Sequence, residues 1–99
     1  EASKRGCAPS EALALCRAVA TLPQLQLRGL MAIPEPTDDE AAQRAPCRQL
    51  REIFDAIRAT GLPLDTLSMG MSHDLEAAVA EGATIVRIGT AIFGERNYA

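Results

Sequence analysis

The sequence predicts an α/β fold built on about three parallel strands, with the element order α-β-α-β-α-β. Helical and extended stretches alternate along the chain, which is typical of βα units. The segment over 25–33 is apolar on both faces, as a strand of a helix-covered parallel sheet requires. A sheet of about three strands leaves its edges unpaired and buries little apolar area. The pattern is therefore typical of an arc from a larger α/β barrel or layered sheet.

The first helix is predicted over about 10–21. Ser10 is a suitable N-cap at its start, and Pro23 prevents the helix from continuing. The strand over 25–33 follows, and Pro34 ends it.

The second helix is predicted to begin at a capping box in which Thr37 and Glu40 satisfy each other's main-chain amides. Gly61 is a natural residue to end it. Pro46 interrupts the stretch, which is either one kinked helix or a short helix followed by a second. An apolar stripe at helical spacing is clearest at Leu50, Ile53, Phe54 and Ile57.

A short strand is predicted over 65–69, followed by a third helix that Ser72 caps and Gly82 ends. The β-branched segment over 84–88 predicts the last strand, and the tail over 90–99 follows. The buried face of the third helix is expected to comprise Leu75, Ala78 and Val79.

The charge balance argues against a nucleic-acid partner. The net charge is −3 and aromatic residues make up 3% of the sequence, so neither a cationic surface nor a base-stacking platform is expected. The apolar runs are too short to span a bilayer, and no signal peptide opens the chain. We therefore expect a cytoplasmic protein without a membrane span.

The cysteines and the acidic residues do not predict a metal centre. Cys7, Cys16 and Cys47 are an odd number of widely spaced cysteines, which fits reduced thiols better than a disulfide framework. His73 is the only histidine, so a structural zinc site is not expected. The acidic run over 38–40 is explained by its place at a helix start, where negative charge is favourable.

The first segment that could bind a ligand covers residues 68–74 (SMGMSHD), where a strand is predicted to end and a helix to begin at once. Main-chain N–H groups at such a turn point at the same space and favour an anion there. Ser68 and Ser72 could add hydroxyl donors. A plainer interpretation is that Ser72 only caps the helix and Gly70 only turns the chain.

The second segment covers residues 87–94 (RIGTAIFG). Arg87 lies in an otherwise apolar strand and needs a partner if buried; a distant carboxylate is one alternative. Gly89 and Thr90 just past the strand offer an approachable main chain and a hydroxyl group. Loops after the last two strands of α/β barrels often hold a phosphate, so the two segments together predict a phosphate site.

No catalytic residue is predicted. His73 has no cysteine or serine beside it that would form a nucleophile–base pair, and it is expected to be a solvated surface residue. The scattered cysteines are expected to be structural or incidental thiols.

Four stretches of the sequence closely resemble the pyridoxal phosphate homeostasis proteins (the YggS/PROSC type). They are residues 1–7 (EASKRGC), 27–34 (LRGLMAIP), 68–72 (SMGMS) and 86–94 (VRIGTAIFG). The resemblance runs from end to end. It implies a fold like the alanine racemase N-terminal domain, a (β/α)8 TIM-type barrel that binds pyridoxal 5′-phosphate. Residues 1–99 would form the C-terminal portion of that barrel, with its last three strands and their helices.

The resemblance also assigns cofactor-binding roles. Arg87 would lie near the pyridine nitrogen, where an arginine in place of a carboxylate keeps that nitrogen unprotonated and weakens the ring as an electron sink. The phosphate would be held by Ser68, Met71, Ser72, Gly89 and Thr90.

In the family, a lysine on an early strand holds the cofactor as a Schiff base. Lys4, the chain's only lysine, does not match the motif of that lysine. The resemblance implies a protein of vitamin B6 homeostasis rather than an enzyme, with this chain carrying the phosphate-binding half of the site without the Schiff-base lysine. The alternatives are a piece of a pyridoxal-phosphate racemase, and a partial barrel or engineered assembly unit without a ligand. Self-association through exposed barrel faces is expected if the chain stands alone.

Overall fold

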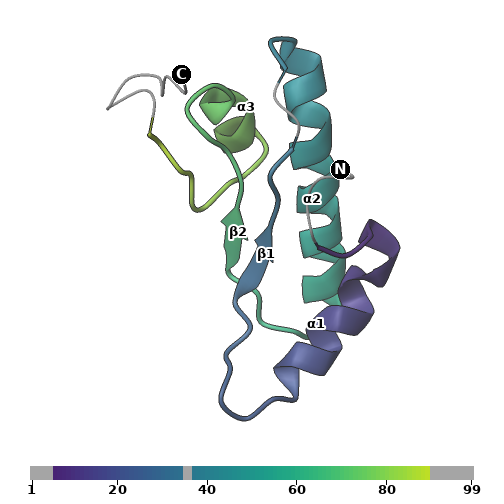
Figure 1. The fold of residues 1–99 in the computed structure, drawn as a ribbon. Coiled ribbons are helices and arrows are strands. Elements are labelled where there is room, and N and C mark those ends of the chain that lie inside the picture. Colours follow the sequence, from purple (N-terminus) through teal and green to yellow (C-terminus); the bar gives the residue numbers. More distant parts are fainter. Residues whose placement is uncertain (1–5, 35–36, 90–99) are drawn as a thin grey trace.

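The computed structural model describes residues 6–34 and 37–89 of the chain. Strands β1 and β2 pair in parallel, with Gly29 opposite Thr66 and Met31 opposite Ser68. Helices α1 and α2 lie on one face of these strands (Figure 1). The elements in chain order are η1 (Pro9–Glu11), α1 (Ala12–Ala20), β1 (Gly29–Met31), α2 (Glu40–Ala59), β2 (Thr66–Ser68) and α3 (Leu75–Ala80).

The predicted last strand over 84–88 is confirmed only in part. In the described part of the chain, Ile85 forms an isolated parallel bridge with Ser68 instead of a regular strand. The hydroxyl oxygen of Thr84 accepts the Leu67 N–H at 2.7 Å. Because this side chain takes the place of a main-chain carbonyl, the regular ladder does not extend to Thr84. The expected element order therefore holds as far as α3, and a bridge stands in place of the final strand.

The first helix starts later than predicted, and Ser10 does not cap it. A turn of 3₁₀-helix precedes α1, and Ser10 lies inside that turn. The Ala8 N–H donates to the Glu11 carboxylate at 3.2 Å, and the Glu11 N–H donates to the Ala8 carbonyl at 2.9 Å. The local bonds between these two residues close the turn, so no serine cap is needed.

The predicted capping box at the start of α2 is wrong. Asp39 is the N-cap, and its carboxylate accepts the Ala41 N–H at 3.3 Å. The Thr37 hydroxyl oxygen instead accepts the Asp39 N–H at 3.3 Å, so it is occupied one step before the helix. Helix α2 continues through Pro46 as one element. Burial of its apolar stripe offsets the main-chain bond that proline cannot donate.

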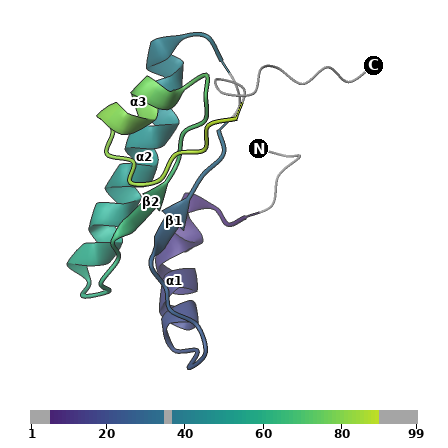
Figure 2. The same cartoon turned by 90° about the vertical axis from the view of Figure 1, so that its left-hand side faces the viewer.

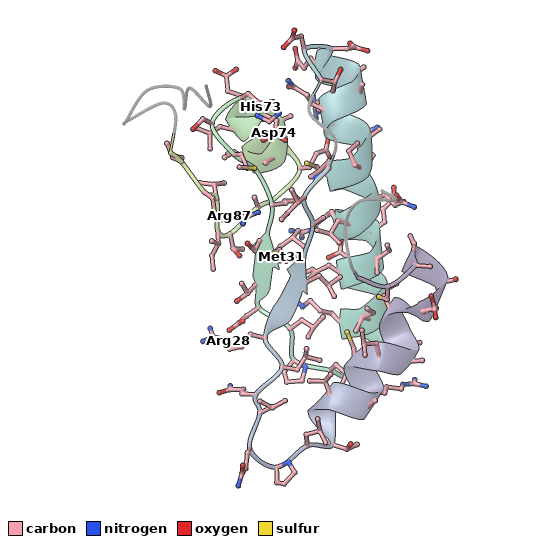
Figure 3. The ribbon with its side chains drawn as sticks, in the orientation of Figure 1. Arg28, Met31, His73, Asp74 and Arg87 are labelled. Carbon is pink, nitrogen blue, oxygen red and sulfur yellow. The ribbon has the colours of Figure 1, made fainter. Side chains whose placement is uncertain are left out.

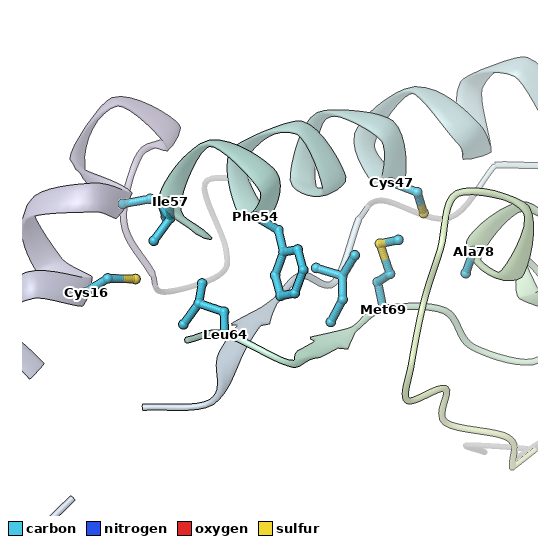
Figure 4. Packing of buried hydrophobic residues seen from close by; sticks show 9 residues of the cluster. Cys16, Cys47, Phe54, Ile57, Leu64, Met69 and Ala78 are labelled. Carbon is cyan, nitrogen blue, oxygen red and sulfur yellow. The ribbon is translucent and has the colours of Figure 1, made fainter. Parts of the chain in front are cut away.

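The hydrophobic core lies between the helices and the covered face of the strands (Figure 4). Phe54 and Ile57 of the predicted stripe are buried, and Leu50 and Ile53 are partly buried against them. Leu67 of β2 has no exposed surface. The buried cluster comprises Ala12, Cys16, Cys47, Phe54, Ile57, Leu64, Leu67, Met69 and Ala78.

Helix α3 packs beside the N-terminal half of α2 (Figure 2). Its buried residues are Ala77 and Ala78, whereas Val79 is 58% exposed. The prediction that Val79 is buried is therefore wrong. Leu75 is half-buried and Ala78 is fully buried, so the buried face of the helix is turned toward Ala77 and away from Val79.

An ion-pair cluster holds the end of α3 on α2. The Glu81 carboxylate accepts from Arg44 at 2.8 Å and from Arg48 at 3.1 Å. Hydrogen bonds from Arg48 and Arg44 lower the pKa of Glu81 below its ordinary value. One carboxylate thus orders two guanidinium groups from successive turns of α2.

The other face of the strands is not covered by any helix of the described residues. Met31, Ser68 and Ile85 are in register across the sheet and therefore share this face. Met31 is 61% exposed and Ile85 is 49% exposed. The expected uncovered face of a partial barrel is thus present among the described residues.

We predict that the isolated 99-residue chain self-associates through this face, since association would remove Met31 and Ile85 from water. Light scattering should give an average mass that rises with protein concentration, and Met31→Lys should lower that mass. Leu15→Lys, on the exposed surface of α1, is the matched control and should leave the mass unchanged. A stable monomer of 10.5 kDa at high concentration would contradict the prediction.

An exposed ion pair joins the residues that directly precede β1 and β2. The Arg28 guanidinium donates to both carboxylate oxygens of Asp65, at 3.0 and 2.8 Å. The hydrogen bond from Arg28, followed by that from Thr66, lowers the pKa of Asp65 to about 2. A lowered pKa stabilises the fold above the unfolded value of about 4, and this stabilisation is lost as the pH falls through about 2.

We predict that Arg28→Gln raises the titration midpoint of Asp65 from about 2 toward the ordinary value, because it removes the paired charge. Carboxyl chemical shifts followed by NMR between pH 5 and about 1.5 would measure it. Arg17→Gln, on the exposed surface of α1, should leave the midpoint unchanged. A wild-type midpoint near 4 would refute the assigned pairing.

Candidate functional site

The candidate site lies where β2 and the segment after α3 end. The turn over 69–74 leaves β2 and leads into α3, and residues 86–89 run beside it. Asp74, His73 and Arg87 come from these two segments, whereas Arg28 lies toward the other end of the strands (Figure 3). The carboxyl ends of parallel strands meet at one edge, which is the usual place for a ligand in α/β folds.

Gly70 allows the turn to pack tightly. Its φ of 106° lies in the region that other residues rarely adopt. A Cβ atom at this position would lie 2.5 Å from the Ala78 Cβ and 3.2 Å from the Val86 Cγ1. The turn is therefore wedged between α3 and the segment that follows it, and only glycine fits there.

Hydrogen bonds join the two segments that the sequence singled out. The Met69 N–H donates to the Ile85 carbonyl at 3.1 Å, and the Arg87 N–H donates to the Gly70 carbonyl at 2.9 Å. Farther along, the Gly89 N–H donates to the Ser72 hydroxyl oxygen at 3.1 Å. The segments are far apart in sequence and adjacent in space. Ser72 thus bonds to Gly89 and does not act as the predicted cap of α3.

Asp74 is the residue that sequence reasoning missed. It is 6% exposed, and its Oδ1 accepts the Met71 N–H at 2.6 Å. The Asp74 N–H donates back to the Met71 carbonyl at 3.2 Å. Aspartate directly before a helix is a frequent cap, and this signal could have drawn attention to it. In this structure the carboxylate closes the turn, and α3 has no side-chain cap bond.

The remaining predicted site residues differ in burial and in hydrogen bonding. Ser68 is half-buried at the end of β2, and its carbonyl accepts the Ala32 N–H at 3.1 Å. Met71 is 40% exposed, and its N–H is the one bonded to Asp74. Thr90 lies outside the described residues.

Arg87 is not buried with a partner in the described part of the chain. Its side chain is exposed, and none of the ion pairs among residues 6–34 and 37–89 includes it. An exposed guanidinium carries no burial cost, so it needs no distant carboxylate here. It leaves a positive charge beside the turn that holds Ser72.

The histidine is a surface residue, as predicted, whereas Cys16 and Cys47 are buried. His73 is exposed, and its carbonyl accepts from the Gln43 side chain at 3.3 Å. Burial raises the pKa of the Cys47 thiol, and the charges of Asp74 and Glu81 raise it further. Within residues 6–34 and 37–89, no group of three histidine, cysteine, aspartate or glutamate residues could hold a metal ion.

One apolar cavity lies away from these residues. It measures about 340 Å³ and lies between the free side of β1, α2 and the segment before α1. Its walls are mostly apolar and include Pro9, Met31, Ile33, Leu50 and Ile53. Its lining includes none of the predicted site residues, so the ligand site is not assigned to it.

Three features of the strand ends bear on the predicted phosphate site. The space around a Cβ at Gly89 is open to 4 Å, so a ligand can approach the main chain there. The Gly89 N–H donates to the Ser72 hydroxyl oxygen, and a phosphate oxygen could accept a hydrogen bond of the same kind. The exposed cation of Arg87 adds attraction for an anion. The Ser72 hydroxyl group and the Gly89 main chain, which come from two segments, therefore lie together at this edge.

Comparison with known proteins identifies the family. A family model described as "Alanine racemase, N-terminal domain" matches residues 2–97. Proteins named "Pyridoxal phosphate homeostasis protein" are 63% identical over 98 residues in Pseudomonas aeruginosa and 52% identical over 99 residues in Vibrio cholerae. These matches cover 99% and 100% of this chain, and 41% and 42% of the two relatives. The chain thus spans about two fifths of their length.

Solved structures agree with this match. A protein of unknown function from Bifidobacterium adolescentis superposes with a TM-score of 0.86 at 44% identity, over 94% of this chain and 38% of that one. PipY of Synechococcus elongatus with pyridoxal phosphate bound gives a TM-score of 0.81 at 40% identity, over 92% and 44% of the two chains. The resemblance drawn from the sequence motifs is confirmed.

The matches leave the position within the barrel as a prediction. The matching model is that of an N-terminal domain, whereas the sequence was interpreted as the C-terminal portion of a barrel. That interpretation finds no support in these matches. As for the membrane, no helix within the described ranges has the length and apolar character to cross one.

Proposed function

We propose that this chain, which belongs to the alanine racemase N-terminal domain family, carries the phosphate-binding part of a pyridoxal 5′-phosphate site. The observation that carries the proposal is the bond from the Gly89 N–H to the Ser72 hydroxyl oxygen at 3.1 Å. This bond brings the ends of two neighbouring segments together, so that their hydrogen-bond donors could bind the same anion. The solved relative from Synechococcus elongatus with bound pyridoxal phosphate supports the choice of ligand.

In this proposal, residues 1–99 form part of one barrel domain. The turn with Ser68, Met71 and Ser72 and the strand end with Gly89 and Thr90 hold the phosphate. The Met71 N–H is bonded to Asp74, so Met71 contributes through its place in the turn rather than as an amide donor. The Ser72 hydroxyl group donates to the phosphate, and the open space at Gly89 lets the phosphate approach the main chain there.

Arg87 is assigned to the surroundings of the pyridine nitrogen. Its exposed guanidinium has no acidic partner within the described ranges, which leaves it able to meet a ligand. A cation at this nitrogen keeps it unprotonated, which weakens the electron-withdrawing chemistry that the cofactor supplies when bound.

The full-length protein is accordingly proposed to bind pyridoxal phosphate for vitamin B6 homeostasis and not to act as a racemase. The names of its relatives support this role. An assay of alanine racemisation by the full-length, cofactor-loaded protein separates the two functions. Turnover at an enzymatic rate would overturn the binding role.

We predict that Ser72→Ala and Thr90→Ala in the full-length protein each weaken retention of pyridoxal phosphate by about tenfold, since each removes a hydroxyl donor to the phosphate. Equilibrium dialysis followed by absorbance would measure it. Ser10→Ala, in the exposed turn before α1, is the matched control and should retain the cofactor as the wild type does. Unchanged retention in both site variants would count against the proposed phosphate site.

We also predict that Arg87→Glu changes the absorbance spectrum of the bound cofactor, because a carboxylate at the ring nitrogen favours its protonation. Arg17→Glu, on the exposed surface of α1, makes the same charge change away from the site and should leave the spectrum unaltered. A spectrum of Arg87→Glu identical to that of the wild type would remove Arg87 from the surroundings of the ring.

A further inference from the structure

The carboxylate of Asp74 is committed to the turn that carries Ser72. Its Oδ1 accepts the Met71 N–H at 2.6 Å, while the Asp74 N–H donates to the Met71 carbonyl at 3.2 Å. These two bonds close the chain between residues 71 and 74. Ser72 lies inside the closed segment, so its direction depends on both bonds.

This use of the carboxylate differs from ordinary helix capping. A capping aspartate accepts an N–H two or three residues ahead of it, within the first turn of its helix. Asp74 precedes α3, yet the structure records no side-chain cap bond there. Its carboxylate reaches back to Met71 instead. The side chain therefore serves the turn and not the helix.

The surroundings of Asp74 make this bond costly to lose. The residue is 6% exposed, and the ion pairs among the described residues do not include it. The buried thiol of Cys47 lies near enough for the Asp74 charge to raise its pKa. Without a cationic partner, a buried carboxylate depends on hydrogen bonds from N–H groups, and such charge-assisted bonds are short and strong.

The turn also has little freedom on its other sides. Gly70 is packed against Ala78 and Val86, and its carbonyl accepts the Arg87 N–H. The Ser72 hydroxyl oxygen accepts the Gly89 N–H at 3.1 Å. The segment between these two anchors is held by the Asp74 carboxylate, so this carboxylate fixes the distance between Ser72 and the strand end.

We propose that Asp74 is the positioning residue of the phosphate site: by holding the Met71 N–H, it sets the turn in which Ser72 meets Gly89. This inference rests on the proposed function. Asp74 does not contact the phosphate, because its charge would repel it. It lowers the cost of ordering the donors before the ligand arrives.

The test compares ligands with and without a phosphate group on the full-length protein. Asp74→Ala should weaken binding of pyridoxal phosphate and of inorganic phosphate by about tenfold, and leave binding of unphosphorylated pyridoxal unchanged. Asp74→Asn should stay within about threefold of the wild type, since its amide oxygen still accepts the Met71 N–H. Titration calorimetry gives all three affinities.

A second readout requires no ligand. Hydrogen exchange of the unliganded protein should speed up over residues 69–74 and at Gly89 in Asp74→Ala. Asp65→Ala is the matched control, because it also removes a carboxylate that accepts hydrogen bonds, in this case from Arg28 at the other end of β2. It should change neither phosphate affinity nor exchange at the turn. If Asp74→Ala does not fold, Asp74→Glu replaces it, because it keeps the charge and moves the acceptor by one methylene.

The outcomes separate the two proposals. A wild-type protein that binds neither pyridoxal phosphate nor inorganic phosphate overturns the proposed function, and the exchange data then decide alone whether Asp74 holds the turn. A wild type that binds both, with an Asp74 variant that binds them equally well, overturns the positioning role only. Equal losses for pyridoxal and pyridoxal phosphate would also overturn it, because they would indicate a general loss of structure.

Discussion

The pairing of β2 with a neighbour on each side is the interaction on which the rest of the structure depends. On one side β2 pairs in parallel with β1, and on the other the Thr84 N–H donates to the Leu67 carbonyl at 2.9 Å. Leu67, at the middle of β2, has no exposed surface. A strand in this position has its direction and register fixed from both sides. The turn that leaves it can therefore be placed accurately.

The two faces of the sheet have different roles. One face is covered by the helices and supplies the core, with Phe54 and Ile57 of α2 packed over the strands. The other face exposes Met31 and Ile85. The chain spans about two fifths of the relatives it matches, and an uncovered apolar face is what a segment of a larger barrel would present. Stability of this chain thus rests on its helix-covered side.

Charges are distributed so that the strand ends stay accessible to an anion. Glu81 is engaged by arginines of α2, and Asp65 is engaged by Arg28 at the far end of the strands. Asp74 lies near the candidate site but turns its carboxylate to the Met71 N–H. Arg87, whose N–H donates to the Gly70 carbonyl, adds an exposed cation beside the turn. A chain with a net charge of −3 can in this way still offer a local site for phosphate.

Much of the fold could be predicted because it follows from local periodicity. The alternation of helical and extended stretches predicted the order of the elements, and the spacing of Phe54 and Ile57 predicted the buried side of α2. Element ends were predicted less well. Thr37 and Ser72 are good caps by composition, yet Asp39 caps α2 and the Ser72 hydroxyl bonds to Gly89. Several polar groups compete for each helix end, and distant partners decide among them.

By itself, the sequence determined the α/β class, the motifs that identify the family, and the two segments that end near the candidate site. These properties depend on residue type and spacing along the chain. The tertiary structure decided the rest: the bond between Ser72 and Gly89, the bridge that replaces a regular last strand, and the burial of Asp74. Each of these is a contact between separate turns or strands, so its formation depends on how the chain packs and not on local pattern.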